Sequence, residues 1–408
     1  MTRDEKQYDA VRKWIKAGGR GIFSHPTGFG KTRCALMAIK SFMSKNKDKL
    51  IRVIVPTEYL KEQWTNTLIE HGLSGSVGVE IINSAIKNPE NVDLLIIDEI
   101  HRAVSKQNIK IFDVKKPKLI LGLSATFNRL DGRHNLILRD IPVVDLITIK
   151  EALSKGWLSD YKEYKVFLEP DDIDEYREMS RQFSEAFSVF DFDFKLAMKC
   201  LTNIIARRTY GKQIGIKPKD MDAIVFTWNR ALKGRKAYVN NHPLKIDVTR
   251  KILDYRPNKK AITFAGTIKQ AEKIGRGHVI HSGKTKKKNR IDLAEFNSMP
   301  SGVLCTSKML DEGADIKGLS LAVILSNSSS SIQLRQRLGR VIRKEGDKEA
   351  EIFHLVLKGT VEENWSKNAS QGMDYIEINE SELDKILKGE KLDALKTDGE
   401  KVDQIFRL

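Results

Sequence analysis

Cysteine is scarce in this sequence. Its 408 residues include three, Cys34, Cys200 and Cys305, and these lie far apart. No CxxC pair can be written, so the spacing excludes a cysteine-based metal knuckle and a disulfide framework. The scarcity predicts a chain that works in a reducing, cytoplasmic compartment.

Long apolar runs are also missing. The first residues, MTRDEKQYDAV, lack the apolar core of a signal peptide. No apolar run approaches the length of about 20 residues that a membrane-spanning helix needs. We therefore expect a soluble protein with no membrane partner.

Acidic residues are fewer than basic ones. Lys and Arg number 71 against 54 for Asp and Glu, which gives a formal net charge of +17. This excess suits a polyanionic partner better than an acidic small molecule, although charge kept for solubility would look the same. With 40% hydrophobic and 31% charged residues, the chain is long enough for two or three domains with cores of their own.

Apolar runs with strand character alternate with helix-like stretches from residue 21 onward. Such alternation is typical of a parallel, doubly wound α/β sheet. The pattern breaks at 171–206, which contains helix formers and neither Gly nor Pro, and it resumes near residue 261, which predicts a second α/β domain. The runs are GIFS (21–24), LIRVIV (50–55), DLLIID (93–98) and KLILGL (118–123) before the break, and AITFAG (261–266), HVI (278–280), GVLCT (302–306), LAVIL (321–325) and EIFHLVL (351–357) after it.

The best junction between the two predicted domains lies near 148–160 (TIKEALSKGWLSD). We place the first α/β domain at residues 1–147. The second is placed at 148–360, with a helical insertion at about 171–255. Residues 361–408 are polar and charged, and we expect them to form a C-terminal appendage.

Residues 26–32, PTGFGKT, follow the first strand-like run and open a helix-like run, KTRCALMAIKSFM. This is the setting of a phosphate-binding loop, whose glycines let backbone N–H groups point at phosphates while the helix N-terminus supplies a favourable dipole. We call residues 26–32 the phosphate loop. His25 stands where the strict pattern has its first Gly, and a Gly-rich turn that only joins a strand to a helix is the alternative. The residues expected to bind ATP here are Thr27, Gly28, Phe29, Gly30, Lys31 and Thr32.

An acidic pair, Asp98 and Glu99, comes directly after the apolar run LLII. Open α/β sheets place their ligands at the carboxyl ends of strands, so this position suits chemistry. Asp98 is expected to hold Mg²⁺ together with Thr32, and Glu99 to orient and deprotonate an attacking water. Surface carboxylates beside a strand end are ordinary, but the pair gains weight from the phosphate loop in the same chain.

A stretch rich in arginine, residues 336–343 (QRLGRVIR), lies in the second predicted domain. Phosphoryl transfer needs a cation at the γ-phosphate, and an arginine finger from another domain can supply it. Arg340 and Arg343 are three residues apart, so on a helix or turn both can reach one phosphate. Taken alone, the stretch would also fit a solvated basic helix face.

Read in order, these segments resemble the successive motifs of superfamily 2 helicases, and the resemblance extends from residue 7 to residue 343. It implies an α/β fold of two tandem RecA-like domains with parallel sheets, the second carrying the helical insertion. It also implies a nucleic-acid-dependent ATPase that uses ATP and Mg²⁺. The segments are PTGFGKT, PTEYLKEQW (56–64), DEIH, SAT (124–126), ITFAGT (262–267), LCTSKMLDEGADI (304–316) and QRLGRVIR.

The resemblance assigns roles to the matching positions. Gln7, in QYDAV, is similar to the glutamine that reads adenine, and Asp315 resembles the acid of motif V; both are counted with the nucleotide-binding residues. Contacts to the nucleic-acid backbone are expected from three threonines near strand ends, each of which could also be a simple turn former. The implied catalytic residues are Asp98, Glu99, Gln336, Arg340 and Arg343, the coupling residues are Ser124 and Thr126, and the three threonines are Thr57, Thr267 and Thr306.

Within the superfamily, PTxxLxxQW, LGLSATFNRLDGR and LDEGADI are more similar to the XPB, RecG and phage UvsW group of DNA translocases than to DEAD-box RNA helicases. By this resemblance we expect an ATP-dependent DNA helicase or translocase that remodels branched DNA by fork regression, branch migration or unwinding, in replication, recombination or repair. Its partner would be duplex, forked or branched DNA in the cytoplasm, at a nucleoid or in a phage-infected cell. A monomer would suffice, because one chain carries both halves of the ATP site. Two alternatives stay open: an RNA helicase, and an ATP-gated clamp or subunit of a larger nuclease complex that separates no strands.

Overall fold

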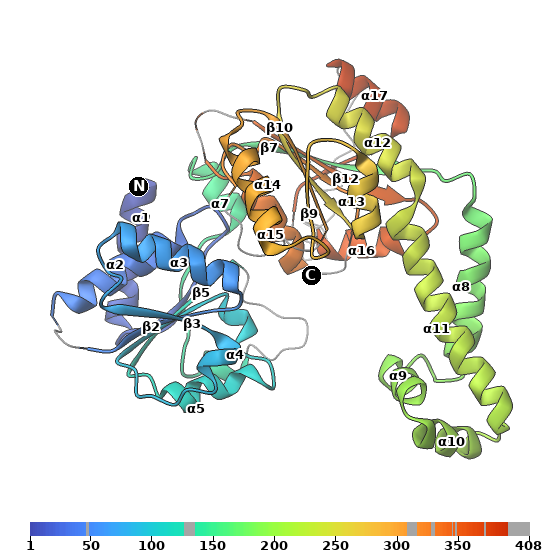
Figure 1. The fold of residues 1–408 in the computed structure, drawn as a ribbon, viewed down its shortest axis with the longest axis horizontal. Coiled ribbons are helices and arrows are strands. Elements are labelled where there is room, and N and C mark those ends of the chain that lie inside the picture. Colours follow the sequence, from blue (N-terminus) through green and yellow to red (C-terminus); the bar gives the residue numbers. More distant parts are fainter. Residues whose placement is uncertain are drawn as a thin grey trace, which may run out of the picture.

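The computed structural model of the chain describes two parallel sheets and a helical arm (Figure 1). The two α/β domains predicted from the apolar runs are confirmed. No helix among the described residues is both long and apolar enough to cross a bilayer. The described residues are 1–45, 49–125, 135–307, 316–327, 331–344, 346, 349–370 and 373–390, without the side chains of 331–333, 335 and 336.

The first sheet has six parallel strands in the order β3-β2-β4-β5-β1-β6. Four of them coincide with the predicted apolar runs, whereas β3 and β6 are short and partly exposed and gave no clear signal. The strands are β1 (Arg20–Ser24), β2 (Ile51–Val55), β3 (Val77–Ile81), β4 (Leu94–Asp98), β5 (Leu119–Ser124) and β6 (Val143–Leu146). The helices around them are α1 (Arg3–Lys16), α2 (Lys31–Met43), α3 (Glu58–Glu70), α4 (Ile82–Ala85), α5 (Ile111–Lys115), α6 (Asn135–Leu138) and α7 (Ile149–Ser154), with short 3₁₀ turns at Ile100–Arg102 and Asn108–Lys110.

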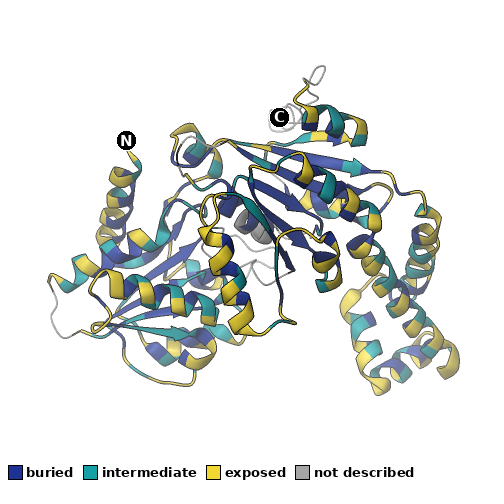
Figure 2. Cartoon of the chain, turned by 45° about the horizontal axis from the view of Figure 1, so that its top comes forward, coloured by how far each residue is buried: buried dark blue, intermediate teal, exposed yellow. Residues whose placement is uncertain are grey.

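The second sheet has seven parallel strands in the order β13-β7-β12-β11-β8-β10-β9. Figure 2 shows buried residues along the strands and exposed ones on the outer faces of the helices. The strands are β7 (Tyr161–Leu168), β8 (Lys260–Ala265), β9 (His278–Ile280), β10 (Gly302–Ser307), β11 (Leu321–Ile324), β12 (Ala350–Leu357) and β13 (Ile376–Asn379). The helices are α12 (Pro243–Asp254), α13 (Ile268–Ile274), α14 (Lys286–Ser298), α15 (Ser331–Val341), α16 (Val361–Ala369) and α17 (Glu380–Lys388).

Residues 361–390 differ from the expected C-terminal appendage. Strand β13 pairs with β7 in parallel, with Ile376 opposite Tyr164. Leu383 and Leu387 of α17 are buried in the core of the second sheet. The stretch looked polar because a four-residue edge strand and one face of a short helix supply few apolar residues. Over its described part, this stretch contributes the edge strand β13 and the helix α17 to the second domain.

Four helices form an arm that projects from the second sheet (Figure 1). They pack around a small core of their own in which Trp228 and Phe190 have no exposed surface. Asp193 and Asn203 cap the two short helices at the tip by accepting hydrogen bonds from backbone N–H groups. The helices are α8 (Ile173–Ser188), α9 (Phe194–Thr202), α10 (Ile204–Gln213) and α11 (Pro218–Asn241).

A fully buried ion pair joins α12 to α16 beneath the second sheet. The Lys245 ammonium lies 2.6 Å from Glu362 Oε1 and donates to the Leu325 carbonyl at 2.8 Å. Glu362 Oε1 also accepts from Asn327 Nδ2 at 3.1 Å. Burial lowers the pKa of Lys245 even though the Glu362 charge opposes that shift. Each charge of this pair therefore depends on the other, because either one alone would be buried without a counter-charge.

Replacing Glu362 by glutamine is expected to lower the free energy of unfolding by about 3–5 kcal/mol, because it leaves Lys245 without its buried counter-charge. Urea unfolding followed by circular dichroism measures this loss. The double replacement Lys245→Met with Glu362→Leu should recover most of it, since no charge then remains buried. Parental stability of the Glu362→Gln protein would show that the pair contributes nothing.

Candidate functional site

The phosphate loop connects β1 to α2. Gly28 and Gly30 have φ values of 89° and 103°, a left-handed conformation that side chains rarely adopt. The loop is tightened by a hydrogen bond from Phe29 N to Pro26 O at 3.2 Å. The ammonium of Lys31, the first residue of α2, donates to the His25 carbonyl at 3.2 Å. Lys31 thus folds back over the loop, where phosphates bind at a helix N-terminus.

Side chains of helix α1 hold the phosphate loop by hydrogen bonds to its backbone carbonyls. Gln7 has no exposed surface, and its Nε2 donates to Phe29 O at 2.8 Å. Arg3 donates to the same carbonyl at 2.8 Å and to Gly28 O at 2.6 Å. The structure therefore brings Gln7 to the loop, as expected for a nucleotide-binding residue. Sequence reasoning missed Arg3, although it precedes Gln7 by four residues and so shares its helix face.

The two predicted acids stand at the end of β4. Asp98 Oδ2 accepts from Trp64 Nε1 at 2.9 Å, and Oδ1 accepts from Glu99 N at 3.0 Å. Burial raises the pKa of Asp98 to about 6, and the Glu99 charge adds to that shift. Trp64, on α3, was not among the predicted site residues. It fixes the carboxylate that is expected to bind Mg²⁺.

Glu99 adopts a left-handed backbone conformation, with φ at 51°, that turns its side chain toward His101. The distance from Glu99 Oε2 to His101 Nδ1 is 3.2 Å. Burial would raise the pKa of Glu99, but the His101 hydrogen bond and the charges of Lys31 and Arg102 outweigh it, so the pKa is lowered. Glu99 is therefore an ionised carboxylate at neutral pH and can accept a proton.

Ser124 links these acids to the phosphate loop. Its hydroxyl lies 3.2 Å from His101 Nδ1, and its carbonyl accepts from His25 N at 3.0 Å. Ser124 has no exposed surface, so the coupling role expected of it would pass through these contacts. Thr126, the other predicted coupling residue, lies outside the described residues.

Helix α15 of the second domain touches the phosphate loop. A Cβ atom added to Gly339 would lie 2.2 Å from Thr27 Cβ, and one added to Gly28 would lie 3.4 Å from Arg343 Cα. The Arg343 charge contributes, after burial and Arg33, to lowering the pKa of Arg3. The backbone of Arg343 thus lies beside the loop.

The structure describes only part of the other residues predicted to bind ATP from the second domain. Arg340 is buried on the same helix as Gly339. Gln336 lies on α15, with its side chain outside the described part, and Asp315 lies outside the described residues. The arginine stretch is accordingly a helix at the domain interface and is not a solvated face.

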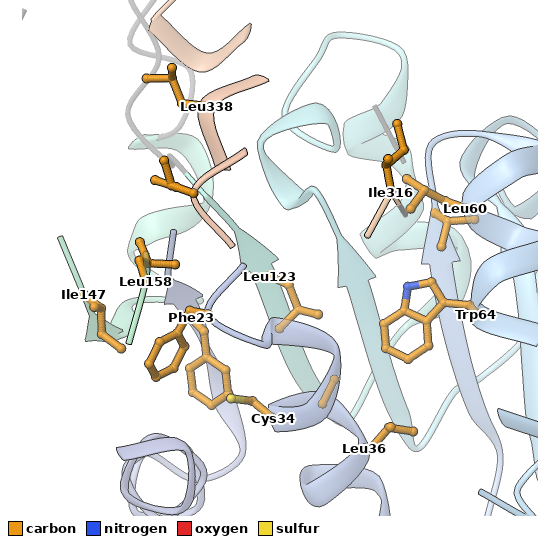
Figure 3. Close-up of a cluster of buried hydrophobic side chains, with 14 of the residues drawn as sticks. Phe23, Cys34, Leu36, Leu60, Trp64, Leu123, Ile147, Leu158, Ile316 and Leu338 are labelled. Atoms are coloured by element: carbon orange, nitrogen blue, oxygen red, sulfur yellow. The ribbon is translucent and has the colours of Figure 1, made fainter. Parts of the chain in front are cut away.

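The linker (155–160) joins α7 to β7 and contacts both halves of the site. Ser159 N donates to Ile342 O at 2.9 Å, and Ser159 Oγ donates to Arg343 O at 3.0 Å. The Trp157 ring meets the Phe29 ring edge-on, with centroids 5.4 Å apart. Figure 3 shows one apolar cluster that includes Phe23 and Leu123 from the first sheet, Leu158 from the linker, and Ile316 and Leu338 from the second domain.

The three threonines expected to contact nucleic acid differ in exposure. Thr57 caps α3 by accepting from Leu60 N at 3.3 Å, and Thr267 caps α13 by accepting from Gln270 N at 3.1 Å. Both are partly exposed at strand ends. Thr306 differs from them, because it has no exposed surface inside β10 and its Oγ1 is buried without a hydrogen-bond partner among the described residues. Contact of all three threonines with nucleic acid stays a prediction.

The donor set fits a nucleoside triphosphate with Mg²⁺. Thr27 Oγ1 and Gln7 Oε1 are buried without a hydrogen-bond partner among the described residues. A Cβ atom on Gly30 would lie 2.5 Å from Gln7 Nε2, so glycine keeps the loop backbone close to α1. Thr32 and Asp98 offer the hydroxyl and carboxylate oxygens that Mg²⁺ prefers.

Two family models match the chain, one in each domain. The model described as "Type III restriction enzyme, res subunit" matches residues 1–88 and 79–129. The model described as "Helicase conserved C-terminal domain" matches residues 244–345. The two matches cover the phosphate loop and α15 respectively.

Curated relatives align over most of the chain. A "DNA 3'-5' translocase XPB2" from Sulfurisphaera tokodaii is 28% identical over 383 residues, which are 88% of this chain and 83% of that protein. "Putative helicase 22" from a Sulfolobus islandicus filamentous virus is 26% identical over 84% of this chain and 62% of its own length. Among solved structures, Dbp5 from S. cerevisiae bound to RNA and ADP BeF3 has a TM-score of 0.60 at 14% identity, covering 94% of this chain and 91% of that one. That likeness supports the fold of two parallel-sheet domains.

Proposed function

The chain is a superfamily 2 helicase related to XPB-type translocases, and hence a nucleic-acid-dependent ATPase. On this premise we propose that it moves along DNA and remodels branched DNA such as forks and junctions. The observation that carries the proposal is the contact between the phosphate loop and α15. This contact supports the expectation that arginines of the second domain reach a γ-phosphate bound at the loop. ATP hydrolysis can then alter how the two domains are held together.

Each site residue has a chemical task in this proposal. Lys31 exchanges its bond to the His25 carbonyl for phosphate oxygens. Thr32 and Asp98 hold Mg²⁺, which neutralises phosphate charge when bound. Glu99 accepts a proton from the attacking water, while Arg340 and Arg343 stabilise the charge that develops at the γ-phosphate.

Several features favour DNA as the track. The aligned relative from Sulfurisphaera tokodaii is named as a DNA translocase. The net charge of +17 suits a polyanion, and the partly exposed caps Thr57 and Thr267 lie at strand ends in different domains. Two grips on separate domains would let the ATP cycle shift one relative to the other. One chain supplies both halves of the ATP site, so a monomer suffices.

The discriminating experiment measures ATPase stimulation by single-stranded DNA, duplex, fork, four-way junction and RNA at one stated salt concentration, because polyanion affinity falls steeply with ionic strength. Forked and four-way DNA are expected to stimulate hydrolysis most. Stronger stimulation by single-stranded RNA would support an RNA helicase instead.

Strand displacement and junction migration are then followed on the DNA that stimulates hydrolysis best. The proposal expects rearranged DNA products that depend on ATP. Stimulated hydrolysis that yields neither product would identify an ATP-gated clamp.

A further inference from the structure

His25 stands where phosphate loops have a glycine, and its surroundings give this side chain a task. The residue has no exposed surface. Its ring stacks on Phe23 with centroids 5.2 Å apart and meets the edge of Phe29 at 5.0 Å. Since Phe29 belongs to the phosphate loop, the imidazole is a spacer between the end of β1 and that loop.

Asp145, on β6, holds the imidazole in place. The distance from His25 Nε2 to Asp145 Oδ2 is 2.8 Å, and the Asp145 side chain is 1% exposed. Asp145 Oδ1 accepts from the ammonium groups of Lys6 at 2.8 Å and Lys13 at 2.7 Å. Helix α1 therefore reaches the loop twice: directly through Arg3 and Gln7, and through Lys6, Asp145 and His25 in sequence.

The polar contact of His25 is more than packing requires. Its Nδ1 is buried without a hydrogen-bond partner among the described residues. Burying an unsatisfied nitrogen costs free energy, so a phenylalanine would fill the same space between Phe23 and Phe29 without that penalty. What an apolar ring cannot supply is the bond to Asp145.

The backbone of His25 connects the ring to the catalytic groups. Its N–H donates to Ser124 O at 3.0 Å, and its carbonyl accepts from the Lys31 ammonium at 3.2 Å. Any shift of the ring moves this carbonyl, and with it the resting position of Lys31. The imidazole anchored by Asp145 therefore limits the positions that the start of the loop can adopt.

From these contacts we propose that His25 and Asp145 are a positioning pair that presets the phosphate loop for nucleotide binding. The pair touches no substrate atom and acts through the loop backbone and Lys31. The inference rests on the proposed ATPase function for its site, but its first readouts need no turnover.

The test compares His25→Phe, which keeps an aromatic ring and removes the bond to Asp145, with His25→Gln, whose Nε2 can still donate to Asp145. The dissociation constant of a fluorescent ATP analogue with Mg²⁺ is expected to rise about tenfold or more in His25→Phe, as for loss of one hydrogen bond to a charged group. His25→Gln should stay close to the parent. The KM for ATP should follow the same order, with kcat changing less.

A second readout uses the nucleotide-free protein. Hydrogen exchange at the loop amides should be faster in His25→Phe and Asp145→Asn than in the parent. The matched control is His354→Phe, which removes another buried histidine whose Nε2 lies 3.0 Å from a carboxylate, that of Glu163, in the second sheet. It is expected to lower the melting temperature while leaving nucleotide affinity and loop exchange unchanged.

Two outcomes would overturn the inference. One is parental nucleotide affinity and loop exchange in His25→Phe, which would make His25 a packing residue. The other is equal loss in His25→Gln and His25→Phe, which would show that a side chain able to donate to Asp145 does not preset the loop. If His25→Phe fails to fold, the same comparison is made between Asp145→Asn and the parent. A parent that binds the analogue but hydrolyses no ATP with any nucleic acid would refute the proposed function alone.

Discussion

Replacing Glu99 by glutamine is expected to slow nucleic-acid-stimulated ATP hydrolysis by about 10²–10⁴-fold, the usual contribution of a general base. The amide keeps the shape of the side chain but cannot take a proton from water. The position of Glu99 beside His101 at the end of β4 supports this role. Steady-state phosphate release measures the loss, and a fluorescent nucleotide should bind as tightly as to the parent.

Lys31→Ala gives the contrasting pattern. It removes a phosphate contact, so nucleotide binding and hydrolysis should fall together. The Glu99 assignment is wrong if Glu99→Gln hydrolyses ATP at the parental rate. A Glu99→Gln protein that loses binding as fully as Lys31→Ala would likewise assign Glu99 to binding and not to proton transfer.

Removing the guanidinium of Arg340 should cost about 10³–10⁵ in ATPase rate, the range found for arginine fingers. Helix α15 lies against the phosphate loop at Gly339, and Arg340 is the next residue. Because the arginine comes from the second domain, Arg340→Ala should retain most nucleotide binding by the first domain. Single-turnover hydrolysis with saturating DNA separates this step from product release.

The matched control for Arg340→Ala is Lys344→Ala, which removes an exposed cation just beyond the same helix. It should hydrolyse ATP near the parental rate. Hydrolysis at the parental rate by Arg340→Ala would contradict the mechanism in which both domains contact the same ATP. A loss that more ATP restores would indicate a binding role for Arg340.

The sheets could be predicted largely because their central strands are buried on both faces. Such strands read as continuous apolar runs, as LLII before Asp98 does. Strands β6 (VVDL) and β13 (IEIN) were missed, since edge strands of four residues carry polar side chains among few apolar ones. Strand β7 was not predicted for another reason. Glu163 and Lys165 are buried in its middle, and these charged residues interrupt the apolar pattern.

The candidate site likewise has features that the sequence could predict and features that it could not. The residues of the phosphate loop and the acids after β4 are local in sequence, so they could be predicted as site residues from motifs along the chain. The pairing of His25 with Asp145 spans 120 positions and that of Ser159 with Arg343 spans 184. Contacts of such separation are fixed by how strands and domains assemble, and no local pattern encodes them. The burial of Thr306 could not be predicted either, because its neighbours indicate a strand end but not which face is covered.

The length of the helical arm means that a small rotation at its base would displace its tip far. Its helix α11 has 24 residues and begins its run at the arm's tip and ends beside the second sheet. At about 1.5 Å per residue the helix is about 36 Å long, so a rotation of roughly 10° about its base displaces the tip by about 6 Å. That displacement exceeds the spacing of about 3.4 Å between successive base pairs in duplex DNA. The length of the arm thus sets how far its tip would move for a given rotation at its base.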